Sequence, residues 1–197
     1  MPVNNEPLKA VRKCIVYGER PITELSLAMM TVDDVGRLIN GIELKDGGRI
    51  PLEKKDQLQQ IFVEAPLGRR FGVIDLLLTY NDFSIMCEIK PDSYDKVSDR
   101  LDAQLPRYLA SIDHGASARQ TRLVRRVHDA ISKKKTFLIT VTKDSSFPPR
   151  LKEFYRRLQH TDAASLGWAS YTHLSSVLER EGFVIEGTSP HIWARER

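Results

Sequence analysis

The sequence predicts an α/β domain in which a central mixed β-sheet is flanked by helices. Short apolar and β-branched runs, typical of strands covered on both faces, are interspersed with longer segments in which apolar residues recur at helical spacing. Polar turn residues separate these segments. The 197 residues, 41% of them hydrophobic, suit one globular domain with its own core.

Helix signals come first along the chain. A helix is expected to open at Pro21-Ile22-Thr23-Glu24, and Thr31 to Asp34 has capping-box spacing for a second helix that stops near Asn40-Gly41. Gly47-Gly48 indicates a turn. Residues 52–60 are then expected to be helical.

Three strands are expected to follow over 61–65, 72–80 and 83–90, where aliphatic and β-branched residues dominate. A crossover helix over 99–112 and a basic helix lead to a β-branched strand over 136–142. The order is therefore αβββαβ. A helix over 151–159, a strand over 167–171 and a helix through Glu181 complete a single domain, residues 1–197, with flexible ends at 1–16 and 188–197.

Charged residues interrupt the second and third strands, which we predict to form a hairpin around Asn81-Asp82. Residues whose numbers sum to 163 then face each other, so Asp75 lies across from Glu88. Side-chain alternation puts Glu88 and Lys90 on one face, with Ile89 opposite. Facing carboxylates repel by about 0.2 to 1 kcal/mol at an exposed site.

A hard divalent cation would offset that repulsion. Lys90 would then orient or deprotonate an attacking water, or stabilise charge on a phosphate. The pattern predicts a metal-dependent phosphodiesterase. In the alternative interpretation, Asp75, Glu88 and Lys90 form a solvated strand face with a weak ion pair, although the apolar flanks favour a covered sheet.

These residues resemble the PD-(D/E)XK nuclease superfamily, which has the restriction-endonuclease-like fold. Asp75 matches the aspartate of the motif, and Glu88-Ile89-Lys90 matches its (D/E)XK half. The segment from Gln104 to Tyr108 is similar to the glutamine-and-tyrosine helix segment that often follows the motif. The resemblance covers roughly residues 57–142, and Ile74 stands where the family name has proline.

The resemblance implies that Asp75, Glu88 and the carbonyl of Ile89 hold Mg²⁺ or Mn²⁺, while Lys90 activates the water. Gln104, four residues before Tyr108 on one helix face, is expected to reach the metal site or a phosphate. The alternative is that Tyr108 packs on the sheet and Gln104 only caps its polar edge.

Two more acids are candidates for the metal site. Glu64 ends the strand that precedes Asp75, and its alternative role is a surface ion pair with Arg69 or Arg70. Glu24 matches in kind the acid that the first helix contributes in many members of the superfamily, and Glu19 is nearly as suitable.

Positive charge is concentrated in one segment, although the formal net charge is only +4. Such a distribution suits a nucleic-acid backbone as partner, and it also suits a solvated helix face whose apolar side has Leu123, Val127 and Ile131. The candidate nucleic-acid-binding residues are Arg119, Arg122, Arg125, Arg126, Lys133, Lys134 and Lys135, with Arg69 and Arg70 ahead of Asp75.

The resemblance therefore implies a Mg²⁺- or Mn²⁺-dependent nuclease that hydrolyses DNA, in restriction, phage defence or repair, with RNA as the alternative substrate. A double-strand cut needs two active sites, which makes a homodimer a hypothesis. The alternatives are a catalytically silent nucleic-acid-binding module on the same fold, or an interaction subunit that uses Trp168, Tyr171 and Ile192-Trp193.

We expect a cytoplasmic protein that makes no membrane contact. No apolar run approaches the roughly 20 residues of a membrane span, and the first residues lack the apolar segment of a secretory signal. The sequence has two cysteines, Cys14 and Cys87, and Cys87 is expected to be a packed thiol on a core strand.

Overall fold

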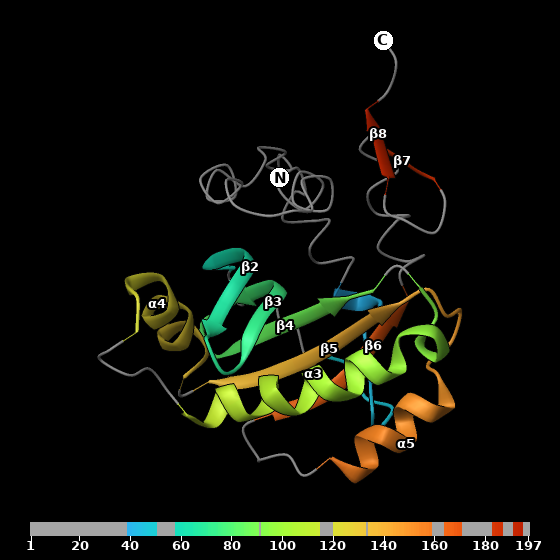
Figure 1. Ribbon diagram of the computed structural model, residues 1–197, viewed down its shortest axis with the longest axis horizontal. Helices are drawn as coiled ribbons and strands as arrows, with labels where there is room; N and C mark the ends of the chain where they lie inside the picture. Colours follow the sequence, from blue (N-terminus) through green and yellow to red (C-terminus); the bar gives the residue numbers. More distant parts are fainter. Residues whose placement is uncertain are drawn as a thin grey trace, which may run out of the picture.

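The computed structural model describes residues 39–50, 58–90, 92–114, 120–132, 134–158, 164–170, 183–186 and 191–194. The elements of the main body are β1 (Glu43–Leu44), β2 (Gln60–Gly68), β3 (Gly72–Thr79), β4 (Phe83–Ile89), α3 (Tyr94–His114), α4 (Arg122–Ile131), β5 (Lys135–Thr142), α5 (Pro149–Arg157) and β6 (Ala164–Ser170). The six strands form one mixed sheet in the order β1-β6-β5-β4-β3-β2, which confirms the predicted α/β architecture (Figure 1). A separate antiparallel pair is formed by β7 (Phe183–Glu186) and β8 (His191–Ala194).

The sheet is mixed because its two halves are connected differently. β2, β3 and β4 follow one another as antiparallel neighbours, whereas β4 and β5, and β5 and β6, are parallel. Parallel neighbours require crossover connections. Accordingly α3 and α4 lie between β4 and β5 in the chain, and α5 lies between β5 and β6. In Figure 1, α3 and α5 lie along one side of the sheet, and α4 lies beside β2.

The predicted crossover helix is confirmed, but it begins at Tyr94 rather than near residue 99. The carboxylate of Asp144 accepts a hydrogen bond of 2.8 Å from the Tyr94 N–H. An acidic side chain at this position satisfies one of the unpaired N–H groups of a helix start. Because Asp144 lies 50 residues away in the chain, local sequence patterns could not reveal this cap.

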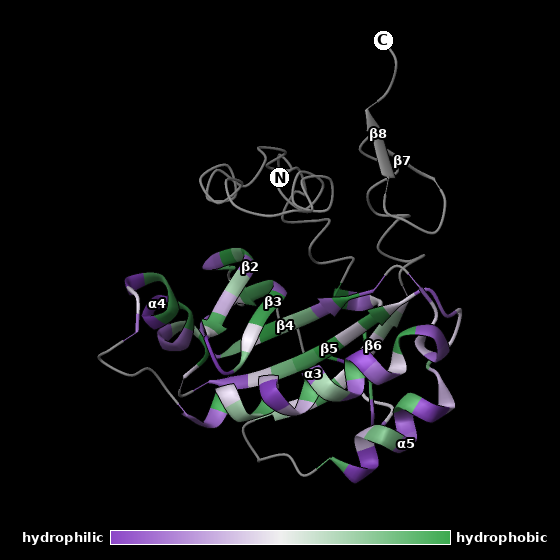
Figure 2. Ribbon diagram, in the orientation of Figure 1, coloured by the Kyte–Doolittle hydropathy of each residue, from purple (hydrophilic) through white to green (hydrophobic). Residues whose placement is uncertain are grey.

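Core side chains form one cluster on each face of the sheet. Met86 of β4 and Leu138 of β5 pack against α3, α4 and α5 on the first face. Ile85, Cys87 and Ile89 belong to the cluster on the opposite face. Figure 2 shows hydrophobic colouring along the central strands, and hydrophilic residues on the helix surfaces that face away from the sheet. Every residue of β4 is buried, so a charged side chain on this strand lies inside the molecule.

β2 and β3 change faces partway along their length. Ile61 and Val63 pack with the cluster of Ile85, whereas Ala65 and Leu67 pack with the helices. An uninterrupted strand would keep these alternate residues on one face. Glu64, between the two pairs, has a φ of 47°, which is rare for a residue other than glycine. The end of the hairpin is therefore turned toward α3 and α4 at Glu64.

Several predicted boundaries need correction. The end of the helix expected over 52–60 is wrong, because Gln59 N–H donates to Thr79 O at 2.8 Å and Gln60 begins β2. The first predicted strand extends to Gly68, and the last begins at Ala164. The predictions did not include β1, β7 and β8.

The remaining helix predictions concern residues that the structure does not describe. Ile39 and Asn40 are helical and Gly41 is in a turn, as expected for the end of the second helix. The helix at Pro21, the rest of the second helix, and the helix through Glu181 lie outside the described residues. Among the helices that the structure describes, none has the length and apolar character needed to cross a membrane.

Candidate active site

The β3–β4 hairpin has the predicted register. Its ladder runs from Thr79 opposite Ser84 to Leu76 opposite Cys87, so the numbers of facing residues sum to 163. The ladder stops one pair before Asp75 and Glu88. At this point Asp75 Oδ2 accepts a hydrogen bond of 2.7 Å from the N–H of Ile89. The carboxylate of Asp75 is thereby held against the main chain of the Glu88-Ile89-Lys90 segment.

Glu88 and Lys90 form a buried ion pair at the carboxyl end of β4. Their exposed fractions are 1% and 4%, and Lys90 Nζ donates to Glu88 Oε1. Lys90 N–H also donates to Val141 O at 2.8 Å, which continues the pairing of β4 with β5. Ile89 packs on the opposite face, as predicted. The burial of both charges excludes the alternative of a solvated strand face.

Electrostatics at this position disfavour two ionised carboxylates. Burial raises the pKa of Glu88, and the negative charge of Asp75 raises it further, while Lys90 and Tyr108 lower it in part. Burial, with a contribution from Asp75, also raises the pKa of the neighbouring Cys87 thiol to about 12. Cys87 is a free, buried thiol, as expected. A cation between Asp75 and Glu88 would oppose the repulsion.

Helix α3 supplies polar groups from the other side of the site. The hydroxyl of Tyr108 lies 3.0 Å from Glu88 Oε2 and 2.9 Å from the carbonyl oxygen of Val73. Gln104 Nε2 donates to this hydroxyl at 3.2 Å. Burial and the charge of Glu88 raise the pKa of Tyr108, which keeps the hydroxyl protonated. Gln104 therefore contacts Tyr108, which in turn contacts Glu88.

These side chains open onto one polar cavity of about 360 Å³. It brings together the sequence-predicted residues Glu64, Asp75, Glu88, Lys90 and Gln104. Gln104 Oε1 is buried and has no hydrogen-bond partner among the described residues, which leaves one acceptor for a ligand or water. Glu24 lies outside the described residues.

The cavity also contains two residues that the sequence reasoning missed, Arg100 and Arg107. Both are exposed residues of α3, and Arg107 donates to Ala103 O at 3.0 Å. They stand four residues before and three residues after Gln104, a spacing that places all three on one side of a helix. That spacing was the signal in the sequence that could have identified them.

The donor set suits a hard cation. Glu64, Asp75 and Glu88 offer carboxylate oxygens on one cavity, and Mg²⁺ uses one or two carboxylates while it keeps several waters. In the part of the chain that the structure describes, no group of three or more His, Cys, Asp or Glu side chains is placed to hold a metal ion. A cation at this cavity would therefore need further ligands, such as a main-chain carbonyl and waters.

The predicted basic cluster divides into separate groups. Arg122, Arg125 and Arg126 are exposed on α4, and Arg69 and Arg70 are exposed at the β2–β3 turn. Lys134 Nζ instead donates to Tyr80 O at 2.6 Å, and Lys135 Nζ lies 5.1 Å from the centre of the Phe137 ring. Arg119 and Lys133 lie outside the described residues.

The apolar face of α4 differs from the predicted one. Leu123 is 49% exposed, so its expected place in the core is wrong. Val127 and Ile131 are buried, as predicted, and Val124 and His128 are buried with them. Thr121 caps α4 by accepting a hydrogen bond from Val124 N–H, as expected for a helix that begins at Arg122.

The site thus combines carboxylate oxygens, a buried lysine and two arginines around one cavity. Such a set can hold a cation, move a proton and bind an anion. Comparisons with protein-family models, with curated proteins and with solved structures give no match.

Proposed function

We propose that the protein is a metal-dependent nuclease with a restriction-endonuclease-like core, and that it hydrolyses phosphodiester bonds in DNA. The observation that carries the proposal is the convergence of Asp75, Glu88 and Lys90 on one polar cavity, with Asp75 bound to the main chain between Glu88 and Lys90. The described order of three antiparallel strands, two helices and a parallel strand is compatible with it.

Asp75, Glu88 and the carbonyl of Ile89 would hold Mg²⁺ or Mn²⁺, with Glu64 as a further acid. The ion would supply neutralisation of the scissile phosphate and acidification of the attacking water. Tyr108 fixes one oxygen of Glu88, and Gln104 fixes Tyr108. Both carboxylates are therefore held in place before the substrate arrives.

Lys90 is the residue that we assign to activation of the attacking water. Its ammonium is buried beside Glu88, whose carboxylate accepts one of its three donors. The remaining donors are available to orient the attacking water or to contact the phosphate. Arg100 and Arg107, at the edge of the same cavity, would bind neighbouring phosphates.

Cleavage of plasmid and single-stranded DNA by wild type and Lys90→Ala tests the proposal. We expect cutting with Mg²⁺ or Mn²⁺, none with EDTA, and a loss of roughly 10²- to 10⁴-fold in Lys90→Ala. Lys96→Ala, which removes an exposed lysine of α3, is the matched control and should cut like wild type. Wild type that binds DNA in every metal but never cuts it would favour the silent binding module instead.

A further inference from the structure

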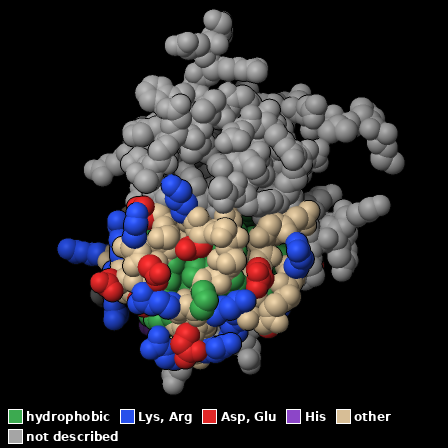
Figure 3. Space-filling view, turned by 90° about the vertical axis from the view of Figure 1, so that its right-hand side faces the viewer, with side chains coloured by type: hydrophobic (Ala, Val, Ile, Leu, Met, Phe, Trp, Pro, Cys, Tyr) green, Lys and Arg blue, Asp and Glu red, His purple; other side chains and the backbone are tan. Residues whose placement is uncertain are grey.

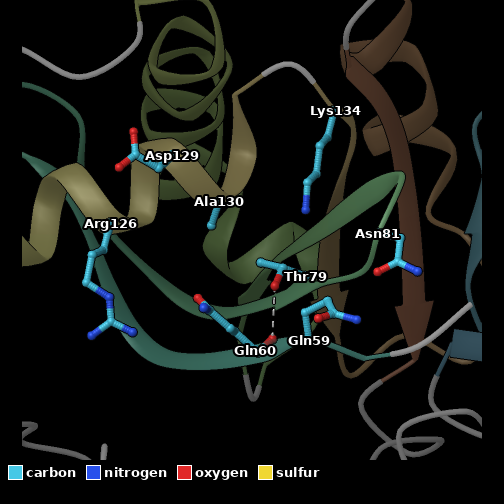
Figure 4. A pocket seen from close by; sticks show the side chains of 8 residues that line it. All are labelled: Gln59, Gln60, Thr79, Asn81, Arg126, Asp129, Ala130 and Lys134. Atoms are coloured by element: carbon cyan, nitrogen blue, oxygen red, sulfur yellow. Dashed lines mark hydrogen bonds between the residues drawn. The ribbon is translucent and has the colours of Figure 1, made fainter.

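A second cavity, of about 450 Å³, lies at the other end of β3 (Figure 4). It is open to the surface and is lined by the start of β2, the end of β3, the β3–β4 turn, the last half of α4 and Lys134. Thr79 in this cavity is four residues along β3 from Asp75, which corresponds to about 13 Å. The two cavities are thus separate sites on the same strand.

The residues that line this cavity are mostly polar or charged. Ala130 is the one aliphatic residue, while Gln59, Gln60 and Asn81 contribute amides. Figure 4 shows the side chains of Arg126 and Lys134 reaching toward the cavity from two sides, and the carboxylate of Asp129 directed away from them. Cations recognise a phosphate, and amides offer both donors and acceptors for the edge of a base. The combination suits a nucleotide rather than an apolar ligand.

Both cations are held in place. Lys134 Nζ uses one of its three donors on Tyr80 O at 2.6 Å, and the Arg126 guanidinium lies 5.9 Å from the centre of the Phe62 ring. Gln60 lies on β2, and its main-chain oxygen accepts a hydrogen bond from Thr79 Oγ1.

A row of exposed arginines connects this cavity with the hairpin end near the active site. Arg122 and Arg126 are four residues apart, hence on one side of α4. The start of α4 lies close to Gly68, because a Cβ added at Gly68 would lie 3.7 Å from the side chain of Val124. Arg69 and Arg70 follow Gly68 directly in the chain. A nucleic-acid backbone can follow such a row of cations.

We propose that the second cavity takes one unpaired nucleotide of the substrate strand, at a distance from the scissile bond. Its phosphate lies between Arg126 and Lys134, and its base contacts the amides of Gln60 and Asn81. An unpaired nucleotide is required because a base must leave the duplex stack to enter a cavity of this kind. The inference rests on the proposed function, since it takes the occupant to be the nuclease substrate.

The test is binding in EDTA, where no cutting occurs, of two labelled single strands of equal length and charge. One strand carries bases and the other is abasic. We expect wild type to bind the first about tenfold more tightly. The double variant Gln60→Ala/Asn81→Ala, which changes two exposed residues, should bind both strands as wild type binds the abasic one.

Arg126→Gln should lower the salt dependence of binding by about 0.7 in the slope of log K against log salt for both strands. Arg156→Gln, an exposed arginine of α5 paired with Glu153, is the matched control and should leave both readouts unchanged. Equal binding of the two strands by wild type, or a base preference that survives in the double variant, would overturn the inference.

Failure of this inference and failure of the proposed function give different results. A protein that cuts DNA with metal but has no base preference retains the proposed function and loses the second site. A protein with a base preference that the double variant abolishes, but without cutting, retains the site and loses the nuclease.

Discussion

At the level of single residues, Glu88 and Lys90 are buried at a cost in desolvation free energy. Both charges are buried, and the negative charge of Asp75 adds to the burden on Glu88. Buried ion pairs are weak evidence for stability because desolvation offsets the attraction. Their joint burial beside a cavity is more readily explained by function than by folding.

The raised pKa of Glu88 predicts how stability depends on pH. The folded state retains a proton that the unfolded state releases near the ordinary value of 4.5. The contribution of Glu88 is therefore fully present below 4.5 and is lost as the pH rises through the raised folded-state pKa. Glu88→Gln should lack this fall. Urea unfolding in EDTA across this pH interval measures it.

The control for this prediction is Glu153→Gln, which changes an exposed glutamate of α5 and should follow the wild-type profile. If wild type and Glu88→Gln give parallel profiles, then Glu88 does not carry the raised pKa. Added Mn²⁺ should reduce the fall in wild type, because a cation opposes the repulsion by Asp75.

The main site residues could be predicted from sequence because they follow strand alternation and a short turn. Predicting the site residues Asp75, Glu88 and Lys90 required only the hairpin register around Asn81-Asp82. The structure confirms this register. Predicting Arg100 and Arg107 also requires knowing which side of α3 faces the hairpin, and their spacing from Gln104 indicates that side. Leu123 was misplaced because fourfold spacing allows more than one apolar face on a helix of ten residues.

At the level of elements, the β2–β3 hairpin positions the acids by changing faces at Glu64. Its φ of 47° was not predictable, because glycine and asparagine favour this conformation and glutamate gives no signal for it. The cap of α3 by Asp144 was hidden for another reason, since it depends on a contact across the fold. Predictions failed where an element depends on a distant partner or on strained backbone.

Two substitutions separate the backbone role of Glu64 from its carboxylate. Asn and Val both remove the charge, but asparagine tolerates a positive φ and a β-branched residue does not. We expect both variants to lose cutting to a similar extent. Only Glu64→Val should lose unfolding free energy, by roughly 1 kcal/mol or more. Denaturant unfolding makes the comparison, and equal stability of the two variants would argue against a strained position here.

At the level of the whole molecule, the described arginines have different surroundings. Figure 3 shows an end of the molecule on which basic and acidic side chains are intermixed. Among the described residues, Arg150 pairs with Asp95, and Arg156 with Glu153. Arg100 and Arg107 instead line the polar cavity of the candidate active site, where the proposed anionic strand would approach. The arginines that form ion pairs with neighbouring acids are therefore different from those that would attract an anionic strand.

This division predicts which arginines the substrate uses. Arg100→Gln and Arg107→Gln should each lower the salt slope of duplex binding by about 0.9, one phosphate contact each. They should raise KM more than they lower kcat, because the phosphates they contact are not the reacting one. Arg150→Gln is the control. Salt slopes equal to wild type in both variants would remove these arginines from the substrate path.

In the proposed nuclease, Asp75 holds the catalytic metal. Asp75→Asn keeps an oxygen for the Ile89 N–H and removes the charge, while Asp82→Asn makes the same change in the exposed turn of the same hairpin. The most direct measurement is cleavage of labelled DNA by both variants in Mg²⁺ and Mn²⁺. We expect wild-type cutting by Asp82→Asn and a loss of at least about 10²-fold in Asp75→Asn. Undiminished cutting by Asp75→Asn would show that Asp75 does not hold a catalytic metal.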